Sequence, residues 1–282
     1  MRKTRGMTNY KGLRPLVDAD SFIYGAGFSA DYEMIKKFME NLGVDRDKAE
    51  ELAAEEDYLG PALGNLKQLC QNAVVNFNED AAQFYLTGSG NYREQIATIA
   101  PYKGNRPDRK PKYYKELRDY IQGVWGAAVI EGMEADDAVS IEQWANKDKS
   151  TIIVSIDKDL NNTPGWHYNP RKDEIYYVSL HEADWNFWKQ VAVGDTVDNV
   201  KGLHRVGAKT VEKAVNESGN DLDQFISWLR RMYDKQYGAE GPHALHENAT
   251  LLWIQRKPWI NYDGSPLREG DGKEESSQES CD

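Results

Sequence analysis

The run TIIVSI at residues 151–156 constrains the fold of this chain more than any other segment. It is continuous, apolar and rich in β-branched residues, as is typical of a strand buried on both faces of a parallel sheet. Stretches with helical character separate it from other strand-like runs. This alternation predicts an α/β fold with a central, mostly parallel sheet and helices on both faces. The other expected strands are 14–20, 81–86, 124–130 and 174–179.

Three parts are expected along the chain. Residues 1–180 should form the α/β core, with a basic arch at about 99–118, and residues 181–262 should form a helical region. Residues 263–282 carry seven acids against two bases and are expected to be a disordered tail. The stretch 40–57 carries eight acids against two bases. We expect it to be an exposed helical surface.

The composition excludes several classes of protein. No run of eighteen apolar residues is present, so no membrane span or membrane partner is expected. The N-terminus is basic but lacks the apolar segment of a secretory signal. Two distant cysteines, Cys70 and Cys281, fit a reducing cytosol.

The net charge of −11 does not exclude a nucleic-acid partner. Charge is distributed unevenly, and residues 93–118 hold eight Lys or Arg against three acids. Tyrosines interrupt this basic stretch, so unpaired bases could stack on Tyr102, Tyr113 and Tyr114, although a solvated charged helix explains the charge equally well. Pro107 and Pro111 argue against one unbroken helix there.

Acids gather where the expected strands end. In open α/β sheets, ligand sites lie at the carboxyl ends of the strands. So many carboxylates repel one another unless cations neutralise them, and oxygen-only ligands favour Mg²⁺ or Mn²⁺. Each group alone has an ordinary explanation, such as a helix N-terminus or a turn, but four groups at matching positions favour a metal site. The groups are Asp18 with Asp20, Glu134 with Asp136 and Asp137, Asp157 with Asp159, and Asp195 with Asp198.

The motifs VDADSFIY, YKGNRP, EADD, SIDKDL and GDTVDNVKGLHRVGAKT resemble, in order and rough spacing, those of the 5′-nuclease superfamily. This group includes flap endonucleases, phage 5′-to-3′ exonucleases and the 5′-nuclease domain of bacterial DNA polymerase I. The resemblance covers residues 14–215. It implies a divalent-metal-dependent enzyme that hydrolyses phosphodiesters at DNA 5′ ends, nicks or flaps during replication, including RNA primers. We expect a monomer that binds DNA in a bacterial cytosol or, for a phage protein, in the infected host cytosol. RNA–DNA hybrids and replication proteins are further candidate partners. The acidic stretch 40–57 could alternatively shape the DNA path or dock a replication protein.

The resemblance also implies roles for individual residues. Lys103 and Arg106 in the arch would steady the scissile phosphate and its transition state. The segment GLHRVGAKT resembles a helix–three-turn–helix that grips duplex DNA and commonly holds K⁺. Two Mg²⁺ or Mn²⁺ ions would be held by Asp18, Glu134, Asp136, Asp137, Asp157, Asp159, Asp195 and Asp198. DNA binding is expected of Arg93, Tyr102, Lys201, Gly202, Arg205, Gly207 and Lys209.

One acid of the family pattern is missing. The second strand usually ends in an aspartate, where this chain has Leu86, Thr87 or Gly88. The site could bind its activating ion more weakly, Asp20 could compensate, or the chain could be a non-catalytic binder of branched DNA. Because every other ligand is present, we expect an active enzyme. A third hypothesis, an RNA-directed PIN-like nuclease, is disfavoured because that group does not need the helix–three-turn–helix.

Overall fold

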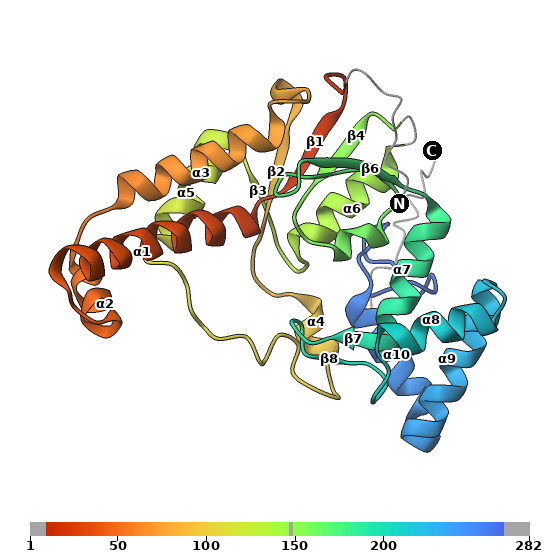
Figure 1. Ribbon diagram of the computed structural model, residues 1–282. Coiled ribbons are helices and arrows are strands. Elements are labelled where there is room, and N and C mark those ends of the chain that lie inside the picture. Colours follow the sequence, from red (N-terminus) through yellow and green to blue (C-terminus); the bar gives the residue numbers. More distant parts are fainter. Residues whose placement is uncertain (1–9, 147–148, 268–282) are drawn as a thin grey trace, which may run out of the picture.

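The computed structural model describes residues 10–146 and 149–267 (Figure 1). Its centre is a six-stranded sheet in the order β3-β2-β1-β4-β5-β6. Neighbouring strands are parallel except for the pair β5–β6, so the predicted mostly parallel α/β sheet is confirmed. The strands are β1 (Arg14–Asp18), β2 (Gln83–Thr87), β3 (Ala128–Ile130), β4 (Thr151–Val154), β5 (Gly165–Asn169) and β6 (Glu174–Val178).

Two strand assignments differ from expectation. The strand expected at 124–130 begins only at Ala128. Val124 and Trp125 instead form the end of a helix, and Gly126 terminates that helix in a left-handed conformation with φ 62°. Sequence analysis missed β5, whose residues GWHYN are mostly polar or aromatic and show no continuous apolar run. It pairs in parallel with β4 and completes the sheet before the antiparallel edge strand β6.

Alternating side chains of the central strands bury two different cores. Val17 and Phe84 point to one face and pack under the helices α1 (Asp20–Leu42), α3 (Leu59–Val74) and α5 (Tyr114–Trp125). Leu16 and Ile153 point to the other face and pack with α6 (Ala135–Ala145). The period of two along a strand therefore explains why helices cover both faces.

The acidic stretch at 40–57 forms the end of α1 and all of the short helix α2 (Arg46–Glu55), in agreement with the helical surface expected there. The far end of α1, together with α2, projects away from the sheet (Figure 1). A small cluster of Ile35, Ala49 and Ala53 joins the two helices.

A second core lies in the helical region after the sheet. It is built from α7 (Leu180–Val193), α8 (Ala208–Glu217), α9 (Leu222–Tyr237) and α10 (Gly241–Leu252), with the small hairpin β7 (Gly194–Asp195) and β8 (Val200–Lys201). The one-turn helices are η1 (Glu79–Ala81), η2 (Asp159–Asn162) and η3 (Gly238–Glu240). No helix in the described part of the chain is long and apolar enough to cross a membrane.

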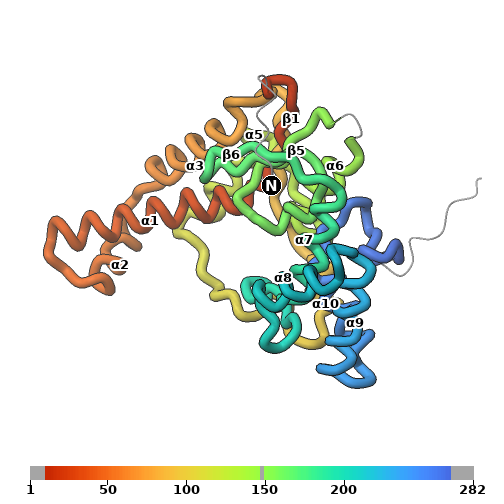
Figure 2. The backbone as a smooth tube through the Cα atoms, turned by 45° about the vertical axis from the view of Figure 1, so that its right-hand side comes forward, coloured from red at the N-terminus to blue at the C-terminus, as the bar shows by residue number. Residues whose placement is uncertain are grey.

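The basic arch is largely irregular. Between α4 (Tyr92–Ile96) and α5, the chain from residue 99 to 113, here called the strap, contains no helix, in agreement with the expectation from its prolines. Figure 2 shows the strap running from the region of α1 to the region of α8. The part of the arch beyond Tyr113 belongs to α5. The strap therefore links the projecting helices to the second core.

Candidate active site

A cavity of about 1020 Å³ opens where β1, β2 and β4 end. Six acids line it, and four of them were predicted as metal ligands. Basic residues from the strap and from the β5–β6 turn also line it, so carboxylates and cations face the same space. The acids are Asp18, Asp20, Glu134, Asp136, Asp157 and Glu174, and the bases are Lys103, Arg106, Lys158, Arg171 and Lys172.

Asp18 and Asp157 are joined through one serine. The Ser155 hydroxyl donates to Asp18 Oδ2 at 3.2 Å and accepts from the Asp157 backbone N–H at 3.0 Å. Burial, then the nearby charges of Asp20 and Asp157, raise the pKa of Asp18 to about 7. Burial, followed by the charge of Asp157, also raises the pKa of Asp159 to about 6. These shifts show that the site concentrates negative charge in a poorly solvated place.

The EADD motif supplies two acids to the cavity. Glu134 stands at the start of α6 and accepts hydrogen bonds from Lys103 Nζ and, at 2.8 Å, from the Tyr102 hydroxyl. Asp136 lines the cavity, and its Oδ1 is buried without a hydrogen-bond partner in the described structure. Burial, then the charges of Asp137 and Glu134, raise the pKa of Asp136 well above its usual value. An unpaired buried carboxylate oxygen is costly unless a ligand occupies the position.

The third acid of the motif has a different role, which corrects its assignment as a metal ligand. Asp137 is 0% exposed, and Arg93 grips it at 2.6 and 2.8 Å. The backbone N–H groups of Gln255 and Glu134 donate to the same carboxylate at 2.9 and 3.3 Å. Both oxygens are therefore occupied by protein donors, and no coordination position is left for an ion.

The same contacts correct the assignment of Arg93 to DNA binding. Arg93 is only 1% exposed, and its guanidinium also donates to the carbonyl oxygens of Leu251 and Trp253 at 3.0 and 2.6 Å. A guanidinium with all of these partners cannot reach a phosphate. Arg93 instead ties α4 to α6 and to the chain that leaves α10.

The strap places two cations over the acids, where sequence analysis expected them. Lys103 forms an ion pair with Glu134, and Arg106 forms one with Asp198. Burial alone would lower the pKa of Lys103, but the charges of Glu134 and Asp198 raise it above its usual value, so Lys103 stays charged. The Lys103 backbone N–H donates to the Asp198 carbonyl at 2.8 Å, which holds this end of the strap against the β7–β8 turn.

Tyr102 does not offer a face for base stacking, which corrects that expectation. It is 8% exposed and packs in the core of the helical region. Its hydroxyl oxygen lies 2.8 Å from a carboxylate oxygen of Glu134 and 2.8 Å from one of Asp198, so its single proton joins two of the acid groups. Tyr113 is likewise engaged, since its ring packs edge-on against Tyr58 at 5.0 Å. Tyr114 does line the cavity.

The remaining acids lie close to the cavity but not in its lining. Asp195 caps the β7–β8 turn by accepting from the Val197 and Asp198 backbone N–H groups at 2.7 and 3.2 Å. Lys158 lies 3.3 Å from an oxygen of Asp159 and 3.9 Å from one of Asp195. The ammonium group of Lys158 thus partly neutralises both Asp159 and Asp195.

The residues fit divalent ions in chemistry. Among the residues that the structure describes, the cavity lining contains no His or Cys, so its candidate metal-ligand atoms are oxygens, and Asp136 Oδ1 has no hydrogen-bond partner. Within residues 10–146 and 149–267, however, no group of three or more His, Cys, Asp or Glu lies close enough together to hold an ion. Lys103 and Arg106 form ion pairs with Glu134 and Asp198. These two acids can therefore bind a metal ion only after the ion pairs break.

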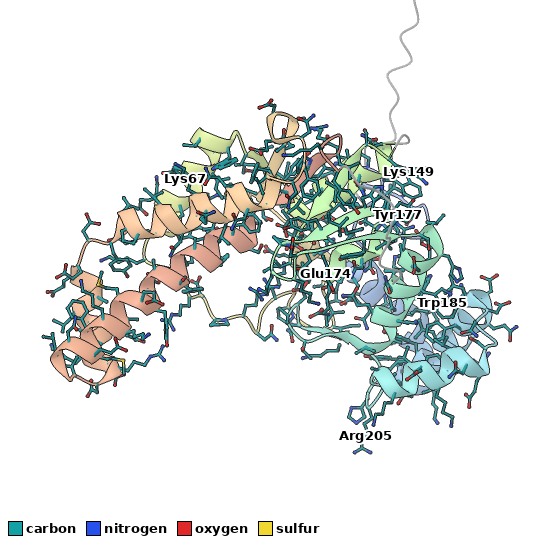
Figure 3. The ribbon with its side chains drawn as sticks, turned by 45° about the horizontal axis from the view of Figure 1, so that its top comes forward. Lys67, Lys149, Glu174, Tyr177, Trp185 and Arg205 are labelled. Carbon is teal, nitrogen blue, oxygen red and sulfur yellow. The ribbon has the colours of Figure 1, made fainter. Side chains whose placement is uncertain are left out.

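The expected DNA-binding turn divides into exposed and packed residues. Lys201, Arg205, Gly207 and Lys209 are exposed, and Arg205 projects from the molecule in Figure 3. Gly202 has a packing role, because a Cβ there would lie 2.3 Å from the Gly194 backbone nitrogen. This explains Gly202 without a close approach to phosphate.

Sequence analysis missed the contribution of the β5–β6 turn. Asn169, Arg171 and Lys172 line the cavity, together with Glu174 and Tyr176 of β6. The signal was the basic turn NPRKDE, which was not placed near the site because β5 went unrecognised. Pairing of β5 with β4 brings this turn to the same edge as Asp157.

No protein-family model matches the chain. Over 187 residues it is 28% identical to a 5′-3′ exonuclease of Aquifex aeolicus, a match covering 61% of this chain and 62% of that protein. Over 203 residues it is 27% identical to the thermostable DNA polymerase I of Thermus aquaticus, covering 67% of this chain and 23% of that protein. In sequence the chain is therefore similar to a bacterial 5′-3′ exonuclease and to a bacterial DNA polymerase I.

Solved structures support the 5′-nuclease fold. The T5 D15 protein co-crystallised with metal ions has a TM-score of 0.54 at 15% identity, covering 84% of this chain and 88% of that one. A T5 5′-exonuclease with bound zinc has a TM-score of 0.52 at 16% identity, covering 85% and 88%. The matched regions span less than two thirds of the length of the two sequence relatives.

Proposed function

We propose that this protein is a divalent-metal-dependent 5′-to-3′ exonuclease or flap endonuclease that hydrolyses phosphodiesters at DNA 5′ ends, nicks or flaps. One observation carries the proposal: acids at the ends of parallel strands face Lys103 and Arg106 across a single cavity. The acids suit divalent ions, and the cations suit a phosphate. The similarity to a 5′-3′ exonuclease supports the same reaction class.

When bound, two Mg²⁺ or Mn²⁺ ions supply the activation of water and the stabilisation of the leaving oxygen that phosphodiester hydrolysis needs. Asp18, Asp136 and Asp157 would hold them from the cavity wall. Glu134 and Asp198 become available as Lys103 and Arg106 transfer from carboxylate to the scissile phosphate. Both cations then stabilise negative charge that develops on the phosphate in the transition state.

The exposed cations after β8 supply a sequence-independent grip on duplex DNA. Lys201, Arg205 and Lys209 lie on the solvent side of this turn, where they can neutralise phosphates. A K⁺ ion at the backbone of Gly202 to Thr210 is part of this proposal. So are removal of RNA primers, a place in replication with replication proteins as partners, a monomeric state and a cytoplasmic location.

A second candidate is a structure-specific DNA-binding protein without catalysis. One observation favours it: the described structure contains no closed group of ligands, and the strap cations already neutralise Glu134 and Asp198. The DNA-binding turn would then act without a working metal site.

A cleavage assay separates the two. A 5′-labelled flap duplex and a 3′-labelled nicked duplex are incubated with Mg²⁺, with Mn²⁺ or with EDTA. The proposal predicts short 5′ products with either metal and none with EDTA, and the product lengths distinguish flap cutting from end trimming. Tight DNA binding without products in either metal would instead support the second candidate.

A further inference from the structure

Of the neighbouring parallel strands β1, β2, β3 and β4, β2 brings no acid of its own to the active-site edge. β1 ends in Asp18, Glu134 follows β3, and Asp157 follows β4. β2 ends in Thr87 and is followed by Gly88. A Cβ at Gly88 would lie 2.6 Å from the Ile130 carbonyl oxygen and 2.5 Å from the Glu131 carboxylate, so this position has no room for a side chain.

The carboxylate of Asp20 stands at this end of β2. Its Oδ2 accepts the Thr87 backbone N–H at 3.0 Å. The chain turns sharply after β1, where the Ala19 N–H donates to the Tyr85 carbonyl at 3.0 Å, and Asp20 begins α1. Asp20, two residues after the end of β1, therefore fills the place that the end of β2 leaves empty.

The electrostatic surroundings place Asp20 between two groups of site acids. After burial, the charge of Asp20 is the next largest cause of the raised pKa of Asp18. Burial also raises the pKa of Asp20 itself, and Glu134 adds to that effect. Asp20 thus interacts with the acid of β1 on one side and with the EADD motif on the other. It lines the same cavity as both.

The ordinary alternative is an ion pair. Arg118 Nη1 lies 3.6 Å from Asp20 Oδ1, and Arg118 also donates to the Thr87 carbonyl. A separation of 3.6 Å exceeds hydrogen-bond length, so this pair engages Oδ1 only weakly. A second, independent observation points to a ligand here: in the same cavity, Asp136 Oδ1 is buried and unpartnered.

We propose that Asp20 serves as an oxygen ligand of the divalent-ion site, held by the Thr87 N–H in the position where β2 lacks an acid. This inference rests on the proposed function, because it concerns the ions of that site. It explains how the site retains its charge although Thr87 and Gly88 contribute no carboxylate.

Metal binding by the full chain tests this without DNA. Mn²⁺ is titrated into the wild type, Asp20→Asn and Asp223→Asn, and free Mn²⁺ is followed by electron paramagnetic resonance. Asp223 is exposed on α9, so it controls for the loss of one negative charge. We expect Asp20→Asn to weaken Mn²⁺ binding roughly tenfold or more, with circular dichroism unchanged, and Asp223→Asn to bind as the wild type does. Wild-type Mn²⁺ affinity and stoichiometry in Asp20→Asn would overturn the inference.

A relocation variant tests the position itself. In Asp20→Asn with Thr87→Asp, the carboxylate returns to the end of β2, and we expect Mn²⁺ binding to recover. Binding as weak as in the single variant would count against a ligand role for this position. The two proposals fail separately: a wild type that binds Mn²⁺ but cuts no DNA contradicts the nuclease. An Asp20→Asn variant that binds Mn²⁺ and cuts as the wild type does contradicts only this inference.

Discussion

Arg93 and Asp137 form a two-point ion pair inside the protein, with N–O distances of 2.6 and 2.8 Å and almost no exposure of either side chain. The pair divides the EADD motif into two functions. Glu134 and Asp136 face the cavity, whereas Asp137 holds α6 to α4 and to the chain after α10. The neighbouring acids Asp136 and Asp137 therefore respond differently to the same substitution.

Asp137→Asn should destabilise the protein by roughly 3–5 kcal/mol, because it leaves Arg93 charged and buried without its partner. Urea unfolding measures this change. Asp136→Asn is the matched control, and it should leave stability unchanged or raise it, since it removes a carboxylate that burial and its neighbours disfavour. Equal losses in both variants would refute the division of the motif.

Asp157→Ala should abolish cleavage in Mg²⁺ while DNA binding in Ca²⁺ is retained or strengthened. The variant removes a carboxylate that would bind the metal ion in the cavity, and it also removes negative charge that repels phosphate. Product formation and fluorescence anisotropy measure the two effects. Asp119→Ala, an exposed acid of α5, should behave as the wild type in both assays. Full activity in Asp157→Ala would contradict the metal assignment.

Lys103→Ala should slow single-turnover cleavage far more than it weakens duplex affinity. Lys103 stays charged beside Glu134 and lies over the acids, so its main role is to stabilise charge during the reaction. The exposed strap residue Lys110 is the control, and Lys110→Ala should affect affinity more than rate. Equal losses of rate and affinity in Lys103→Ala would show that Lys103 only binds phosphate and does not stabilise the transition state.

Metal affinity should rise with pH between about 5 and 8. Ligation requires ionised carboxylates, and the pKa values of Asp18 and Asp159 are raised to about 7 and about 6. In the metal-free protein the stability trend is opposite. An unfolded Asp titrates near ~3.9, so between that pH and the folded pKa the native state binds more protons, and stability falls as pH rises. Mn²⁺ titrations and urea unfolding at several pH values measure both. Affinity independent of pH would contradict these shifts.

Lys112→Ala should loosen the strap. Lys112 Nζ donates to the carbonyl oxygens of Ala53 and Ala54 at 3.2 and 2.7 Å, so it caps the C-terminus of α2 and fixes the strap to the projecting helices. Limited trypsin digestion without DNA should cut the variant faster after Arg109. Lys115→Ala is the control, because its exposed pair with Asp119 lies within α5. Unchanged digestion of Lys112→Ala would show that other contacts hold the strap.

The sequence by itself determined the α/β fold and the position of most site acids. Strand runs such as TIIVSI are apolar enough to be buried on both faces, and acids placed directly after them must lie at the edge of a parallel sheet. The family resemblance placed Lys103 and Arg106 over the site, and both side chains line the cavity.

Only the tertiary structure decided which polar side chains face the cavity. Asp136 and Asp137 are adjacent in sequence, yet one lines the cavity and the other is enclosed by Arg93 and Gln255. Tyr102 has similarly become part of a core, and Asp20 stands at the end of β2. The role of a polar side chain depends on what packs over it and on which donors reach it. Those donors come from distant parts of the chain, so local sequence patterns do not specify them.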